Sequence, residues 1–502
     1  MASFSIAPAR RTCMPGKIVT FPAWAAAVLL LVFTAGAGFA AGGLAKYLFL
    51  AGCFPIGWLA WRQSPAMHVK TALLLFAFTP LVRRMVDLTA GFDSSSLMLV
   101  GPLLALVAVL PSLLNDANNR TLFADRRLGL PVIIFICVLY AVILTIFRGQ
   151  WNDAIVGAVK WLVPLLYGAA LLRFADRDEI IEAATSAFMW ILPLTGLYGL
   201  YQFVDPPEWD RNWMNFATIM SAGNPLPYEI RTFSTMNGPA TFGYFTSIGL
   251  ILVTFLRPVY VGIPLAAPAA ISLLLSQHRA AWIGVVLVLF FTLWKKGTRA
   301  RAGLIFAGII GAGMLALMIP TFADVITERL ETFTQGNQDH SVQERMEQFV
   351  LLWNNPDPWN ALLGIGFTTV DVGVAGSMAI DGMFIESWLM LGLVAGPIYL
   401  IAFIWINLSM ARKAFIEPDP RVVPAAGLAF FTLFQIPFGS FTNGELEFIF
   451  WIVASFSLCL RHPSREPAAV VLDSSPDRTK QRRNRAGETF RAPRRESAID
   501  PR

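Results

Sequence analysis

The chain has 502 residues, of which 56% are hydrophobic and 14% are charged, and its formal net charge at pH 7 is +6. Soluble globular proteins carry about 25% charged residues, so this composition excludes an ordinary soluble domain and predicts an integral membrane protein. We expect the lipid bilayer, and no nucleic acid, to be its main environment.

Apolar runs long enough to cross a bilayer recur along almost the whole chain. A bilayer core needs roughly 20 helical residues per crossing, and the runs lack the alternation of barrel strands. The sequence therefore predicts an all-α polytopic membrane protein with about 12–14 transmembrane helices. The expected spans lie near residues 23–40, 44–61, 68–88, 96–114, 129–147, 154–173, 183–203, 238–256, 259–276, 279–295, 303–321, 383–408, 424–440 and 445–461.

Lysine and arginine concentrate in every second loop and in both terminal segments. Because basic loops stay on the cytoplasmic side of a membrane, both termini are predicted to be cytoplasmic. This divides the chain into a cytoplasmic N-terminus (1–22), a transmembrane domain (23–461) and a tail (462–502). The tail contains "KQRRNR" and many serine, proline and charged residues, which predicts a disordered, basic cytoplasmic segment. Contact of this tail with anionic lipid is the alternative.

Two loops on the outer side are much longer than the others, at about 204–237 and 322–381. In the larger loop, "SVQERMEQFVLLW" opens with a capping box of Ser341 and Glu344 and predicts an amphipathic helix. "NNPDPWNALLGIGF" then predicts a turn, a short helix and a bend at Gly364 and Gly366. Loops of this length in a compact domain are usually functional or disordered.

The first outer loop also contains "DPPEWDRNW", in which acidic and aromatic residues alternate. Glu208 and Asp210 could contact sugar together with Trp209 and Trp213. Anchoring of the two tryptophans at the membrane interface is an equally good explanation.

Basic residues on the outer side gather near one depth. Arg279 lies in "LLLSQHRAAWIG" at the outer end of its expected helix, with no acidic neighbour in sequence, and Arg231 lies in the first outer loop. Arg83 and Arg84 lie at the outer end of the third span, and Lys160 in the outer half of the sixth. Snorkelling to lipid headgroups would explain any one of them. Together they suit an anion carried on a lipid, such as the diphosphate of an isoprenoid-linked sugar.

Several short motifs resemble the bacterial O-antigen ligase and Wzy-type polysaccharide polymerase family in their order and expected topology. They are "RTFSTMNGPATFGYF" (231–245), "LLLSQHRAAWIG" (273–284), "DHSVQERMEQFVLLW" (339–353), "LLGIGF" (362–367) and "DGMFIESWLMLGLVAG" (381–396). In addition, "LVRRMVDLTAGFD" (81–93) looks like the third-span region of the exopolysaccharide polymerase branch. The resemblance covers roughly residues 70–460.

This resemblance implies a GT-C-like fold in the bacterial inner membrane and a metal-independent glycosyltransferase without a cofactor. The substrate would be an undecaprenyl-diphosphate-linked oligosaccharide, transferred at the periplasmic face. The family's outer arginines are thought to hold the diphosphate, and the matching positions are Arg231, Arg279 and Arg345, with Arg83 and Arg84 as further candidates. Guanidinium groups would stabilise the charge that builds on the leaving diphosphate.

An acceptor hydroxyl must also lose a proton, which requires a general base. Ligases of the family carry a histidine at the end of the large loop, where this chain has Asp381 followed by Gly382. Asp381 is therefore one candidate base, although it could equally cap a helix. His340 is the other candidate, with a loop or capping role as its alternative.

The missing histidine favours a polymerase that extends O-antigen or exopolysaccharide over an O-antigen ligase. A polymerase would work with a flippase and a chain-length regulator, as the resemblance implies. A lipid-oligosaccharide flippase or transporter is the alternative from another class. Such a transporter would be expected to show repeated halves with interrupted helices, and the sequence shows no such repeat.

Overall fold

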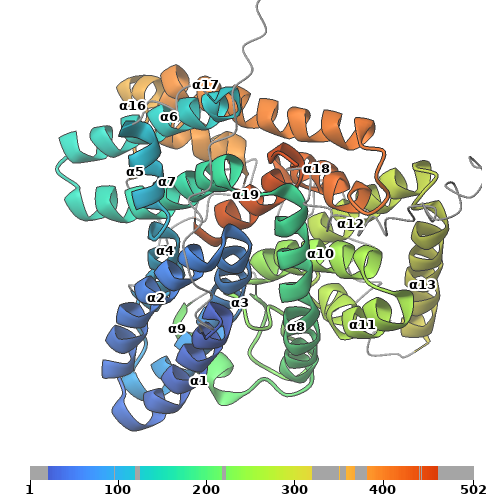
Figure 1. Ribbon diagram of the computed structural model, residues 1–502. Helices are drawn as coiled ribbons and strands as arrows, with labels where there is room; N and C mark the ends of the chain where they lie inside the picture. The colour runs from blue at the N-terminus through green and yellow to red at the C-terminus, as the bar shows by residue number, and fades with distance from the viewer. Residues whose placement is uncertain are drawn as a thin grey trace, which may run out of the picture. The chain divides into compact units, whose positions relative to one another are not determined.

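The computed structural model describes residues 21–94, 97–118, 125–217, 222–318, 350, 358–367, 382–439, 441 and 444–461. Within these ranges the protein is all-α, with one isolated antiparallel bridge between Gly223 and Ile230 (Figure 1). The predicted tail (462–502), most of the N-terminal segment and most of the predicted amphipathic helix at 341–353 lie outside the described residues.

The described part of the chain folds into a series of helices. In order, they are α1 (Ala23–Ala41), α2 (Leu44–Gln63), α3 (Pro65–Ala90), η1 (Leu97–Leu99), α4 (Val100–Val107), α5 (Leu110–Asn118), η2 (Arg126–Leu128), α6 (Gly129–Phe147), α7 (Trp151–Phe174), α8 (Arg177–Val204), α9 (Glu208–Ala217), α10 (Pro239–Leu256), α11 (Val259–Leu275), α12 (Arg279–Trp294), α13 (Arg299–Leu317), α16 (Pro358–Leu363), α17 (Met383–Ile416), α18 (Val423–Gln435) and α19 (Gly444–Leu458).

Every expected span coincides with a helix, except that the run at 96–114 is broken into η1, α4 and α5. Among the described residues, nine helical stretches are long and apolar enough to cross a membrane. The protein is therefore a multi-pass helical membrane protein. Nine is fewer than the predicted 12–14, because α11, α12 and α18 are apolar but have only 10–17 residues.

Local sequence explains where several helices begin and bend. The side chain of Ser64 accepts a hydrogen bond from the amide of Met67, and Pro65 occupies the first position of α3. Asp176 caps α8 in the same way. Gly392 interrupts α17 with a φ of 66°. The predicted short helix and bend are confirmed: α16 is followed by Gly364 and Gly366 at positive φ. The predicted turn before this helix lies almost entirely outside the described residues.

The central helices are the most deeply buried. Eighty-three per cent of the α10 span lies inside the protein, and α19 is buried throughout residues 447–457. Aromatic rings join neighbouring helices: Phe76 stacks on Phe448 at 4.1 Å between centroids, and Phe403 on Phe450 at 4.4 Å. α3 packs against α1 on one side and α8 on the other.

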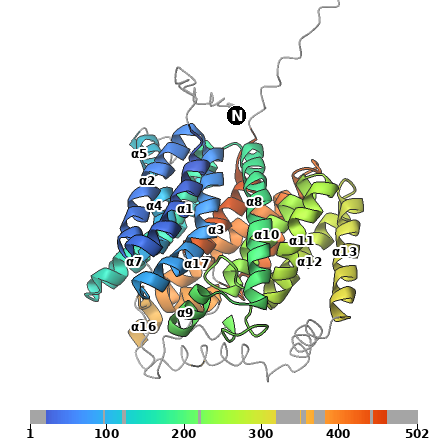
Figure 2. The same cartoon turned by 90° about the horizontal axis from the view of Figure 1, so that it is seen from below.

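The two ends of the helix bundle carry different groups. One end, which we call the α9 end, carries α9, α16 and the first long loop (Figure 2). At the opposite end, which we call the basic end, arginines bridge loops and helix ends: Arg177 pairs with Glu417 at 2.6 Å and Arg173 with Asp116 at 2.7 Å. These pairs fix the ends of α8, α17, α5 and α7.

Candidate functional site

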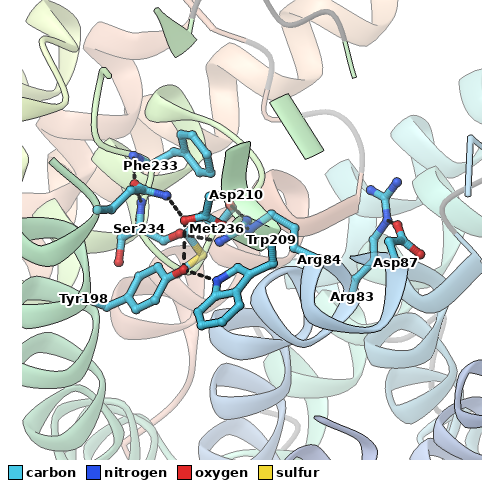
Figure 3. Close-up of polar contacts among 10 residues, drawn as sticks. Arg83, Arg84, Asp87, Tyr198, Trp209, Asp210, Phe233, Ser234 and Met236 are labelled. Carbon is cyan, nitrogen blue, oxygen red and sulfur yellow. Dashed lines mark hydrogen bonds and ion pairs between the residues drawn. The ribbon is translucent and has the colours of Figure 1, made fainter. Parts of the chain in front are cut away.

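Arg84 lies in the last two turns of α3 and is buried at the α9 end. Its Nε donates to Asp210 Oδ1 at 2.6 Å, and its two terminal nitrogens donate to the carbonyls of Met236 at 2.6 Å and Ser234 at 2.5 Å (Figure 3). The guanidinium also lies 5.0 Å from the ring centroid of Phe233. Arg84 therefore joins α3 to α9 and to the segment before α10.

Asp210, on α9, is fully buried and accepts hydrogen bonds from several donors besides Arg84. The hydroxyl of Tyr198 donates at 2.8 Å and Gln202 Nε2 donates at 2.5 Å, both from α8. Trp209 in turn donates to the Tyr198 hydroxyl at 2.7 Å. The Asp210 carboxylate therefore holds α9 against α3 and α8, and because it is fully buried it is not accessible to a sugar.

Residues 231–236, which we call the Arg231 segment, run between the α9 region and the start of α10. Gln202 Oε1 accepts the amides of Phe233 at 3.1 Å and Ser234 at 2.8 Å. The Ser234 hydroxyl donates to the Thr195 carbonyl at 2.5 Å, and Ser234 itself has a φ of 54°. A serine at positive φ is strained, so these contacts are what hold the segment in this shape.

The Arg231 segment also lies against the connection between α11 and α12. The amide of Thr232 donates to the carbonyl of Leu275 at 3.2 Å, and the amide of Arg231 donates to Ala222 at 2.9 Å. Arg279 follows Leu275 by four residues and is the first residue of α12. The backbone bond therefore brings the positions of Arg231 and Arg279 to the same end of the bundle.

Arg279 is half-buried at the N-terminus of α12, and the first turn of this helix contains no acidic residue. The N-terminus of a helix is the positive end of its dipole, which favours anions and disfavours a cation. The dipole of α12 therefore does not favour an arginine at this position. An anion bound near Arg279 would meet both the guanidinium and the helix N-terminus.

The beginning of α17 lies next to the beginning of α12. Gln435, at the end of α18, donates from Nε2 to the Ala280 carbonyl at 2.7 Å, and the next residue, Ile436, accepts from the Met383 amide at 3.2 Å. Gly382 directly precedes Met383 in α17. Asp381 itself lies outside the described residues, as do His340 and Arg345.

Arg83 belongs to a different buried cluster. Its Nε lies 3.2 Å from Asp87 Oδ2, and it donates to the Asp93 carbonyl at 2.8 Å. Lys46 Nζ lies 2.7 Å from the other oxygen of Asp87. Figure 3 shows Arg83 beside Asp87 and Arg84 beside Asp210, so adjacent residues serve separate partners. In this structure both guanidinium groups donate to protein acceptors, and contact of Arg83 or Arg84 with a diphosphate stays a prediction.

Two carboxylates at the start of α19 were not among the residues predicted from the sequence. Glu445 takes side-chain hydrogen bonds from Asn237 and Thr241, at the end of the first long loop and the start of α10, and lies within the electrostatic influence of Lys160. Glu447, two residues further along α19, is buried. The signal that could have revealed them is "NGELEF", where two ionisable residues open an apolar span, a pattern that marks functional sites in membranes.

Metal-ligating residues do not cluster in the part of the chain that the structure describes: no group of three or more His, Cys, Asp or Glu could hold an ion there. Cys53, Cys137 and Cys459 are free and buried. The predicted metal independence of the reaction remains a prediction.

Comparison with protein-family models gives no match for the chain, and comparison with curated proteins gives none either. The resemblance of its motifs to the O-antigen ligase and polymerase family therefore remains a prediction from the sequence.

Proposed function

We propose that the protein is a polysaccharide polymerase related to the O-antigen ligases. It transfers an oligosaccharide from undecaprenyl diphosphate to an acceptor repeat unit at the periplasmic face of the bacterial inner membrane. The observation that carries this proposal is the position of Arg231 and Arg279, from two separate segments, at one end of an apolar helix bundle. A GT-C-like arrangement of the helices is part of the proposal.

The proposed chemistry requires a site that holds the leaving group more strongly as its charge develops. Departure of a lipid diphosphate concentrates negative charge on phosphate oxygens, and planar guanidinium groups bind such oxygens in pairs. Arg231 and Arg279 would supply these groups, with Arg345 as a third. The N-terminus of α12 adds backbone amides directed at the same anion.

The base is proposed to be Asp381, the residue that ends the second long loop just before Gly382 and Met383. The Met383 amide donates to the Ile436 carbonyl, close to the start of α12. A carboxylate can take the proton of an acceptor hydroxyl. Asp381→Asn is expected to lower polymer formation by about 10²-fold or more, and His340→Ala by less. The reverse result would transfer the role to His340.

The proposed orientation places the basic end in the cytoplasm, with both chain termini, and the α9 end in the periplasm. In this orientation the substrate arrives from a flippase after crossing the membrane, and a chain-length regulator acts on the product. These partners are proposed from the motif resemblance.

The experiment replaces Arg279 with lysine and with alanine in a strain that lacks the native gene. Lysine keeps the charge but loses the planar fork, so Arg279→Lys should form much less polymer and Arg279→Ala almost none, a loss of about 10²-fold or more. Arg299→Lys is a matched control. It is also the first residue of a helix, α13, but it lies at the basic end and donates from Nε to the Leu293 carbonyl at 3.0 Å.

The readout is polymer per membrane-inserted protein, with lipid-linked single repeats measured in parallel. Loss of polymer with accumulated single repeats supports a polymerase that uses Arg279. Full-length polymer that remains on its lipid carrier indicates an O-antigen ligase. Loss of single repeats from the outer leaflet indicates a flippase or transporter. Wild-type amounts of polymer from both Arg279 variants would refute the diphosphate-binding role and indicate that Arg279 only extends its guanidinium to the lipid headgroups.

A further inference from the structure

We propose that Gln202 is a positioning residue that fixes the shape of the Arg231 segment and thereby the place of the Arg231 guanidinium. The effect of Gln202 on catalysis rests on the proposed function, but its effect on the segment does not. Gln202 lies in the last turn of α8, two residues before the end of this helix, and is fully buried.

The side-chain amide of Gln202 has one orientation that satisfies its neighbours. Its Nε2 faces Asp210 Oδ2 at 2.5 Å, and its Oε1 faces the backbone amides of Phe233 and Ser234. Turning the amide over would place its oxygen against a carboxylate and its NH₂ against two N–H donors. Arg84 and Tyr198 hold Asp210 in turn, so the orientation of Gln202 is determined by a buried charge pair.

The Arg231 segment needs this support because its backbone is strained. Ser234 has a φ of 54°, a conformation that a residue with a Cβ rarely adopts. All three of its polar groups are engaged: the amide with Gln202, the carbonyl with Arg84 and the hydroxyl with the Thr195 carbonyl. Without the Gln202 acceptor, two amides lose their partner and the strained turn is free to relax.

Relaxation of this turn would reach Arg231 directly. Arg231 precedes Phe233 by two residues, and between them the amide of Thr232 is bound to Leu275 beside α12. The segment is thus held by α8 on one side and by the start of the α12 connection on the other. Gln202 supplies the contact between α8 and the segment. Loss of this contact would allow Arg231 to shift, and a shift of about 1 Å in a binding group can cost roughly 10²-fold in rate.

Gln202→Met tests the proposal, because methionine has a similar length, carries no charge and neither donates nor accepts strongly. The Arg84–Asp210 pair remains intact in this variant. Thr185→Val is the matched control: Thr185 is equally buried on the same helix, but its hydroxyl donates only to the Ile181 carbonyl within α8. Amide hydrogen exchange of residues 231–236 is measured in purified full-length protein, and polymer formation is measured in cells.

We expect exchange at Phe233 and Ser234 to be faster by roughly tenfold or more in Gln202→Met and unchanged in Thr185→Val. The catalytic efficiency toward the lipid-linked donor should fall by about tenfold or more only in the methionine variant. Gln202→Glu adds a pH signature. When ionised, its carboxylate would repel Asp210, whereas a protonated carboxyl group donates to Asp210 again, so polymer formation by this variant should rise relative to the wild type as the pH is lowered.

Unchanged exchange in Gln202→Met would overturn the positioning role. Faster exchange with wild-type polymer formation would overturn its link to Arg231 function. Faster exchange in a protein whose wild type forms no polymer would support the positioning of the segment and refute the proposed function instead.

Discussion

Replacing Asp210 with asparagine should strongly destabilise the protein. The carboxylate accepts hydrogen bonds from Arg84, Tyr198 and Gln202, and all three neighbours donate. An asparagine at this position must direct its NH₂ group at one of these donors, and it leaves the buried Arg84 guanidinium without its counter-ion. Breaking a buried charge pair by removing one partner costs about 3–5 kcal/mol.

This cost translates into a measurable change in thermal stability. Melting temperatures shift by about 2–4 °C per kcal/mol for domains of 150–250 residues and by less for longer chains. For this chain we expect Asp210→Asn to melt roughly 3–10 °C below the wild type. The assay is thermal unfolding in detergent at a fixed heating rate, followed by the amount of protein that remains monodisperse, because unfolding of such proteins is usually irreversible.

A second variant separates the charge pair from other effects. In Arg84→Met combined with Asp210→Asn no buried charge is left uncompensated, so the double variant should be less destabilised than the sum of the two single variants. Additive effects, or an Asp210→Asn protein that melts like the wild type, would refute the conclusion that this pair holds α3, α9 and the Arg231 segment together.

Two further predictions concern the orientation and the basic end. Leu226 is exposed at the α9 end, and a cysteine introduced there should react with a membrane-impermeant thiol reagent from outside the inner membrane. A cysteine introduced at the exposed Lys296, at the basic end, should not react. The native Cys53, Cys137 and Cys459 are buried, and Cys13 is replaced by serine so that it does not contribute to labelling. The reverse labelling would invert the proposed topology. At the other end, burial raises the pKa of Asp125, but hydrogen bonds and charge from Arg127, with the charge of Arg173, outweigh it and hold this pKa below its ordinary 3.8. The pKa of Asp125 is lower in the folded state than in the unfolded state, so its carboxylate stabilises the fold above pH 3.8 and loses this effect as the pH falls through the folded-state pKa. Asp125→Asn should therefore lower the melting temperature at pH 7 and lower it much less at strongly acidic pH. A pH-independent difference would contradict this role.

The positions of the helices could be predicted from the sequence because apolar length is a local property. Spans such as 238–256 and 129–147 agree with α10 and α6 to within one residue at each end. The break in the run at 96–114 was not predicted, since "LMLVGPLLALVAVLPSLL" is uniformly apolar and carries no signal for two separate helices beyond its prolines. Gly364 and Gly366 were correctly assigned to a bend.

The partners of the arginines could not be predicted in the same way. Arg84 and Asp210 are separated by 126 positions, and their pairing depends on how α9 folds back against α3. Both roles predicted for Arg84, contact with lipid headgroups and contact with a diphosphate, require a guanidinium that reaches out of the protein. Its actual partner, the buried carboxylate of Asp210 on α9, becomes evident only from the fold.

The arginines at the α9 end differ in their burial and in their positions along the helices. Arg83 and Arg84 are buried, and Asp87 and Asp210 compensate their charge within the protein, so their presence in a membrane helix has a structural explanation. Arg279 is half-buried at the positive end of α12, where its charge opposes the helix dipole. Arg299 has the same position in α13, but it lies at the basic end and donates to the carbonyl of Leu293 near the C-terminal end of α12. The dipole therefore makes Arg279 the more informative residue to replace: an anionic ligand would stabilise both the arginine and the helix end.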